Sequence, residues 1–222
     1  MYDNQTIASA RGRDSVLATN KVLRNTYMLL SLTLLFSGLT AYIGMSSGIV
    51  LGFLPTILIY FGLLFATEKT ADSGLGLVFV FALTGFLGFT LGPILTFYLH
   101  TPQGANLVMT ALGGTGVIFL GLSGYALTTR KDFSFMGGML VTGILIAFVA
   151  GLGAFVFNMP ALSLAVSAMF ILLMSGLILF QTSQIIHGGE TNYIRATVTL
   201  YVALYNLFLS LLRILSAFSG RN

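Results

Sequence analysis

Cysteine is absent from this chain of 222 residues, and histidine occurs only twice, at His100 and His187. The absence of cysteine excludes disulfides, thiolate chemistry and cysteine-based metal sites. Two histidines so far apart in the sequence do not form a metal-binding cluster either. We therefore expect neither a bound metal nor a cofactor.

Charge is also scarce: 7% of the residues are charged, 56% are hydrophobic, and the mean hydropathy is +0.96. Soluble globular domains do not have such values, which predict an integral membrane protein in contact with the lipid bilayer. A formal net charge of +4 would suggest nucleic acid as the partner of a soluble protein. Here the basic residues lie beside apolar segments, where membrane topology accounts for them, so nucleic acid is excluded.

Acidic residues are missing from the interior of every apolar segment. Those nearest to the segments, Glu68, Asp72, Asp132 and Glu190, lie at or beyond segment ends. Proton relays and cation pores usually place carboxylates within the membrane, so a pump or a carboxylate-lined channel is disfavoured. No HExxH motif and no Ser–His hydrolytic pattern is found. The sequence thus predicts a protein that is not an enzyme.

Long uncharged runs define the predicted spans. Because roughly 20 helical residues cross a bilayer core of about 30 Å, the first three runs have room for two helices each and the last for one. Continuous apolarity disfavours a β-barrel, whose strands would alternate in polarity. We expect an all-α integral membrane protein with seven transmembrane helices, drawn from residues 27–67, 73–129, 133–189 and 196–219.

The chain is predicted to divide into a polar N-terminal tail, residues 1–26, and a seven-helix transmembrane domain, residues 27–222. Two alternatives stand for the tail: a disordered segment, or a short surface helix over residues 15–24. The apolar run after the tail is too long for a signal peptide and lacks a small-residue cleavage site. We therefore expect the tail to remain on the mature protein.

Basic residues predict the orientation, because cytoplasmic connectors carry an excess of Lys and Arg. Eight of them fall on the side of the tail, which places the N-terminus in the cytoplasm and, with seven spans, the C-terminus on the outer side. Arg221 is the one discordant charge beyond the last span. The eight are Arg11, Arg13, Lys21, Arg24, Lys69, Arg130, Lys131 and Arg195.

Polar residues in the sixth span recur at three-residue intervals, at Gln181, Gln184 and His187. They share one side of the predicted helix, near its cytoplasmic end. One interpretation is a polar vestibule with a histidine that can change charge near neutral pH. The other is hydrogen bonding between helices together with an interfacial histidine.

The seventh span carries a stripe of small and polar residues at helical spacing, which includes Asn206, Ser210 and Arg213. Lipid cannot satisfy a carboxamide, so this stripe should face the protein interior. Arg213 lies about six residues, on the order of 9 Å, from the outer end of the span. It could extend outward to the interface or point inward as a functional cation.

Glycine is abundant within the spans, and we expect it to allow close helix packing, notably at Gly85, Gly88 and Gly92. Pro93 directly follows Gly92. A proline within a helix removes one backbone hydrogen bond and tends to kink it. Gly92 and Pro93 therefore mark either a structural kink or a candidate helix break that lines a polar site.

Four segments of the chain resemble the bacterial branch of the Bax inhibitor-1 family, and the resemblance covers nearly everything after the tail. It implies a seven-helix fold with the last helix enclosed by the other six, in the bacterial inner membrane. The segments are KVLRNTYMLLSLTLLFS (21–37), GFLGFTLGPIL (85–95), YALTTRKDFSFMGGML (125–140) and HGGETNYIRATVTLYVALYNLF (187–208).

The resemblance implies two alternative functions. Some bacterial members of the family bind and restrain the membrane-bound AAA protease FtsH; other members are pH-sensitive calcium leaks that use a pair of Asp residues in the last two spans. Alignment on the HGG turn and the LYNLF segment places that pair at Gln181 and Ala203, and neither can ionise. We therefore expect a modulator of an FtsH-type protease, with a calcium or ion leak as the alternative and Glu68, Glu190 and Arg195 as candidate contacts on the cytoplasmic face.

Overall fold

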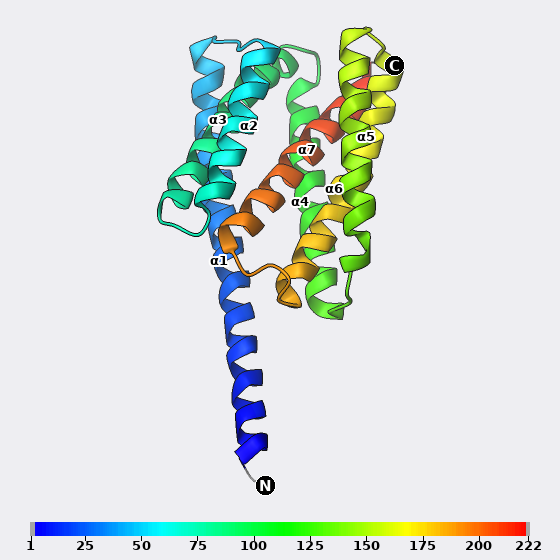
Figure 1. Cartoon of the computed structure of the whole chain (residues 1–222). Helices are drawn as coiled ribbons and strands as arrows, with labels where there is room; N and C mark the ends of the chain where they lie inside the picture. Colours follow the sequence, from blue (N-terminus) through cyan, green and yellow to red (C-terminus); the bar gives the residue numbers. More distant parts are fainter. Residues whose placement is uncertain (1–2, 221–222) are drawn as a thin grey trace.

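The computed structural model describes the backbone of residues 3–220 and the side chains of residues 17 and 19–220. It is helical throughout this range (Figure 1). Seven of its helices are long and apolar enough to cross a membrane, so the predicted number of spans is confirmed. The elements are α1 (Asp3–Ser47), α2 (Phe53–Thr70), α3 (Leu75–Leu99), α4 (Gly104–Thr129), the short 3-10 helix η1 (Ser134–Met136), α5 (Gly137–Val156), α6 (Pro160–Ile186) and α7 (Tyr193–Ser219).

Helix α1 joins the polar tail to the first span without an interruption of the helix. Its apolar part begins at Tyr27, and the start of the helix projects beyond the rest of the bundle (Figure 1). From residue 3 on, the backbone of the tail continues α1 and does not form a separate short helix. The side chains of Arg11 and Arg13, and all of Arg221, lie outside the described residues.

The bundle has two ends, which we call the N-side and the C-side. On the N-side lie the projecting part of α1 and the connectors 71–74, 130–136 and 187–192; the connectors 48–52, 100–103 and 157–159 lie on the C-side (Figure 1). Every lysine and arginine with a described side chain lies on the N-side, except Arg213. The charge distribution that predicted the orientation is thus a property of the folded chain.

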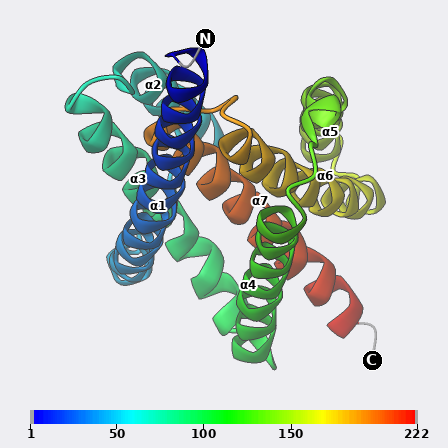
Figure 2. The same ribbon diagram turned by 90° about the horizontal axis from the view of Figure 1, so that it is seen from below.

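Helix α7 lies in the middle of the bundle when it is viewed along the helices (Figure 2). Half of its most apolar window is buried, a larger share than in any other described span. It packs against α1, α3, α4 and α6, and Arg195 links it to α2. The expected central position is confirmed, although α5 packs mainly on α6 rather than on α7.

Helices α1 and α3 pack closely because glycines leave room for backbone contact. A Cβ on Gly88 would collide with the carbonyl oxygen of Ser37, and one on Gly92 would collide with the backbone of Gly44. Since lipid supplies no hydrophobic force between helices, such small residues permit the van der Waals contact that holds them together. The packing role expected of the α3 glycines is therefore present in the structure.

Glycines of α4 are different, and none of them has another glycine four residues away, as Gly88 has in Gly92. No described atom lies within 4 Å of a Cβ built on most of them, so they do not bring a described helix close. The expected packing role fails for these positions within residues 3–220. They are Gly113, Gly116, Gly121 and Gly124.

Pro93 lies inside α3, and the helix continues through it to Leu99. The candidate break at Gly92 and Pro93 is therefore absent from α3 as the structure describes it. Neighbouring helices and side chains can compensate for a proline in a membrane-spanning helix. Here Gly92 contacts α1 while Pro93 lines a cavity on the C-side.

Candidate functional site

Charged residues on the N-side meet at the start of α7. The Nε atom of Arg195 lies 2.8 Å from Oε1 of Glu68. This contact is ionic and does not have the geometry of a hydrogen bond. The terminal Nη2 atom of Arg195 donates a hydrogen bond to Asp72 at 3.1 Å. The carboxylate side chains are 62% and 76% exposed. Exposed ion pairs of this kind contribute about 0–1 kcal/mol each. The structure thus brings Glu68 and Arg195 together, as members of one cluster.

Asn192 holds this cluster to the backbone, and it was not among the residues singled out from the sequence. Its Oδ1 atom caps α7 by accepting from the amides of Ile194 and Arg195, at 2.8 and 3.2 Å. Its Nδ2 atom donates to the carbonyl oxygen of Ala71 and to Asp72, at 2.9 and 2.8 Å. An Asn before an apolar run is a recognisable helix-start signal, but its contact with the α2–α3 turn is not visible in the sequence.

Glu190 completes the cluster by accepting a 2.8 Å hydrogen bond from the amide of Asn192. We call this set the N-side clasp: it fastens the beginning of the central helix to the turn between α2 and α3. The five members are Glu68, Asp72, Glu190, Asn192 and Arg195. Of the three expected face contacts, Glu68 and Arg195 bind each other, whereas Glu190 binds the amide of Asn192 in its own connector.

His187 links the end of α6 to the α4–α5 connector. Its Nδ1 atom lies 2.9 Å from the carbonyl oxygen of Ser183, and its Nε2 atom lies 3.1 Å from that of Arg130. Carbonyl oxygens only accept, so both hydrogen bonds form together when both ring nitrogens carry protons. Ser183 strengthens the link, because its hydroxyl donates to Lys131 at 3.2 Å and accepts from the amide of Phe133 at 3.0 Å.

Asp132 lies in the same connector. Its Oδ1 atom accepts a 2.8 Å hydrogen bond from the amide of Ser134, which starts η1. This hydrogen bond, with a smaller contribution from nearby His187, lowers the pKa of the Asp132 carboxyl below its ordinary value. The ionised carboxylate is therefore the form that stabilises this connector.

The two glutamines of α6 make different contacts. Gln181 is buried, and its Nε2 atom has no hydrogen-bond partner among the described residues. The side chain of Gln184 lies against Gly189. Its main-chain carbonyl oxygen accepts hydrogen bonds from the amides of Gly189 and Glu190, at 2.9 and 3.1 Å. Gln184 thus helps to close the turn after α6, whereas the side chain of Gln181 faces the interior of the bundle.

A buried hydroxyl network in the core was also missed from the sequence. Tyr201 of α7 is 2% exposed, and its hydroxyl contacts Ser37 of α1 at 2.6 Å and the carbonyl oxygen of Thr84 of α3 at 3.1 Å. It lies opposite the expected polar stripe. A tyrosine in the middle of an apolar span was the available signal, since buried Tyr hydroxyls usually find a partner.

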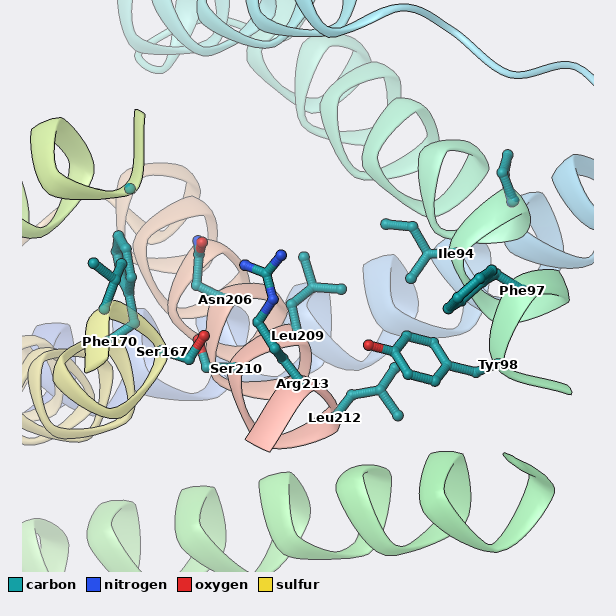
Figure 3. A pocket seen from close by; sticks show the side chains of 13 residues that line it. Ile94, Phe97, Tyr98, Ser167, Phe170, Asn206, Leu209, Ser210, Leu212 and Arg213 are labelled. Atoms are coloured by element: carbon teal, nitrogen blue, oxygen red, sulfur yellow. The ribbon is translucent and has the colours of Figure 1, made fainter. Parts of the chain in front are cut away.

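The polar stripe of α7 opens into a cavity on the C-side, shown in Figure 3. Two adjoining hollows of about 590 and 710 Å³ share part of their lining, and we call them together the C-side cavity. The side chains of Asn206 and Arg213 line both hollows, and Ser210 lines the first. The shared lining is Tyr98, Gly151, Phe170, Asn206 and Arg213.

The described residues contain no group of three or more His, Cys, Asp or Glu side chains that could hold a metal ion. What the structure does contain is a central helix, a clasp at one end of it and a polar cavity at the other. These features define a multi-pass α-helical membrane protein with its polar groups arranged along the last span.

Comparison with known proteins shows the family. A family profile described as "Inhibitor of apoptosis-promoting Bax1" matches residues 19–220, and the chain belongs to this Bax inhibitor-1 family. It is 52% identical over 222 residues to the "Modulator of FtsH protease YccA" of Escherichia coli K12, covering 99% of this chain and 100% of that protein. A second E. coli strain has the "Inner membrane protein YccA" with the same identity and coverage. An uncharacterised protein of Pseudomonas aeruginosa is 50% identical over 200 residues, 90% of each chain.

Proposed function

We propose that this protein binds and restrains a membrane-bound AAA protease of the FtsH type in the bacterial inner membrane. The observation that carries the proposal is 52% identity, over almost the whole of both chains, to a protein named as a modulator of that protease. In this role the protein acts by binding and catalyses no reaction of its own.

The shape of α1 supports this function. From Asp3 to Thr26, the last residue of the polar tail, the helix extends about 35 Å at 1.5 Å per residue. The positive-inside rule, applied to the N-side basic residues, supports a cytoplasmic position for this segment and a periplasmic C-terminus. It offers a protease a helical segment to engage.

The packing of α7 explains why engagement would restrain the protease rather than lead to degradation. Extraction of α1 would have to break its backbone contacts with α3 and its hydrogen bond to Tyr201. The N-side clasp holds the next helices to the same centre. A protease that pulls on the tail therefore meets a cooperative bundle, and each exposed polar group would be costly in lipid.

Co-purification tests the proposal directly. A tagged full-length chain, extracted in mild detergent, should retain the protease, and its overexpression should lengthen the half-life of a membrane substrate of that protease. A variant lacking residues 2–14 should still insert but lose most of this effect on half-life. Absence of association with the full-length chain would refute the proposal, whereas association without tail dependence would refute the role given to α1.

A calcium leak along α7 is the second candidate, and the C-side cavity beside Asn206 is the observation that favours it. Arg213 on the cavity wall opposes it, because a positive charge repels cations. Calcium flux into proteoliposomes decides the matter: a leak by this route should respond to Asn206→Leu and to pH. We expect little flux, and an unchanged flux in Asn206→Leu would exclude this route.

A further inference from the structure

Arg213 belongs to the last span, and its side chain is exposed. It lies six residues before Ser219, where α7 ends, which is about 9 Å along the helix axis. Its guanidinium group is directed into the C-side cavity, close to Asn206 (Figure 3). A charged side chain at such depth is costly unless it is paired or solvated.

No carboxylate lines the cavity to balance this charge. Neither of its hollows contains an Asp or Glu side chain, and both salt bridges among the described residues are made by Arg195 at the other end of α7. The acidic residues with described side chains all lie on the N-side. They are Glu68, Asp72, Asp132 and Glu190. The cavity therefore has a net positive electrostatic character.

The rest of the lining is suited to an anion with an apolar tail. Ser210 and Asn206 line the cavity beside Arg213 on α7, and Tyr98 lines it from α3. One amide hydrogen of Asn206 is donated to the carbonyl oxygen of Val202, which leaves the other for a ligand. Pro93, Phe97, Phe155 and other apolar side chains form most of the remaining lining. Guanidinium groups bind phosphate oxygens through paired, charge-assisted hydrogen bonds. Hollows of this size are typical of small-ligand sites.

We propose that the C-side cavity binds the phosphodiester headgroup of an anionic phospholipid from the adjacent leaflet. Arg213 supplies the counter-charge, Tyr98, Ser210 and Asn206 supply hydrogen bonds, and the apolar wall receives the upper part of an acyl chain. The site is independent of protease binding, which involves the opposite end of the bundle.

Native mass spectrometry of the full-length, delipidated protein tests the site with phosphatidylglycerol and phosphatidylcholine as probes. The wild type should bind phosphatidylglycerol in preference, and thermal unfolding in neutral detergent should shift upward as this lipid is added. Arg213→Gln should weaken that binding by roughly tenfold, whereas Arg213→Lys should keep part of it. Lys69→Gln, which removes a positive charge on the N-side, is the matched control and should bind as the wild type does.

Arg213→Gln should unfold at the same temperature as the wild type in neutral detergent, or higher, because it removes a charge from membrane depth. Should this variant fail to fold, Tyr98→Phe and Ser210→Ala keep the charge and should each weaken phosphatidylglycerol binding. Equal binding of the two lipids, or full binding by Arg213→Gln, would overturn the proposal. Stabilisation by millimolar inorganic phosphate, without any preference for phosphatidylglycerol, would show that the cavity binds free phosphate and would overturn the assignment of a lipid ligand.

Discussion

Tyr201 of α7 accepts a hydrogen bond from Ser37 of α1, because its own proton is donated to the carbonyl oxygen of Thr84 in α3. One hydroxyl therefore joins three helices that are distant in the sequence. The apolar surroundings make these hydrogen bonds specific, since a group left without a partner there is costly.

Tyr201→Phe should destabilise the protein by about 1–2 kcal/mol, because Ser37 loses its buried partner while the ring still fills its place. Thermal or denaturant unfolding in mild detergent would measure the loss. Tyr205→Phe is the control: its hydroxyl makes only a 3.3 Å contact with Thr90, which also donates to the carbonyl oxygen of Leu87. A Tyr201→Phe protein as stable as the Tyr205→Phe protein would contradict the importance of the network.

Gly88→Ala should force α1 and α3 apart, because the added methyl group would overlap the Ser37 carbonyl oxygen. Overpacking of this kind costs about 1–3 kcal/mol. Gly113→Ala makes the same chemical change where no described atom lies within 4 Å, and it should be neutral or slightly stabilising because Ala favours helix. Equal unfolding temperatures for the two variants would show that the contact between α1 and α3 is not tight.

Within the N-side clasp, Asn192→Ala should be more harmful than Arg195→Gln. Loss of Asn192 removes the helix cap and two hydrogen bonds to the α2–α3 turn, at about 1–2 kcal/mol. Loss of Arg195 removes exposed ion pairs worth about 0–1 kcal/mol, which salt would screen. Unfolding at low and high salt should therefore separate the variants, with the Arg195→Gln effect shrinking as salt rises. The reverse order would assign the stability to the charges.

The Asp132 connector should respond to acid. Its pKa is lowered by the hydrogen bond from the amide of Ser134, so its stabilising effect is present above the unfolded pKa and is lost as pH falls through the lower, folded value. The difference in unfolding temperature between the wild type and Asp132→Asn should thus be full above about pH 5 and should shrink as the pH falls through the acid range. A difference that is constant over this range would mean that the charged form has no special role.

The spacing of charged residues was sufficient to predict the seven spans. The length of each uncharged run, compared with the number of helical residues that cross a bilayer, gives the number of spans in that run. The family resemblance implied the central place of α7, whereas the residues themselves indicated only that the face with Asn206 points toward the protein interior. The contacts between particular pairs of helices could not be predicted from the sequence. Gly88 meets another helix and Gly113 does not. The GxxxG spacing of Gly88 and Gly92 favours a close contact, but which helix they meet depends on the arrangement of all seven helices.

The candidate site was predicted in its parts rather than as a whole. Glu68 and Arg195 were each noticed at span ends, but their pairing depends on the α2–α3 turn meeting the start of α7. Asn206 and Arg213 were placed on one stripe, and the structure adds the cavity that they share. Helical spacing shows on which face of a helix a residue lies. It does not show how much space separates that face from the neighbouring helices.

The central position of α7 has a consequence for biosynthesis. The ribosome produces this helix last, after the four helices that pack against it. Until α7 has entered the membrane, Ser37 and Thr84 lack the tyrosine hydroxyl that joins them in the folded protein. A chain cut short before α7 therefore has none of the contacts that this helix makes with α1, α3, α4 and α6.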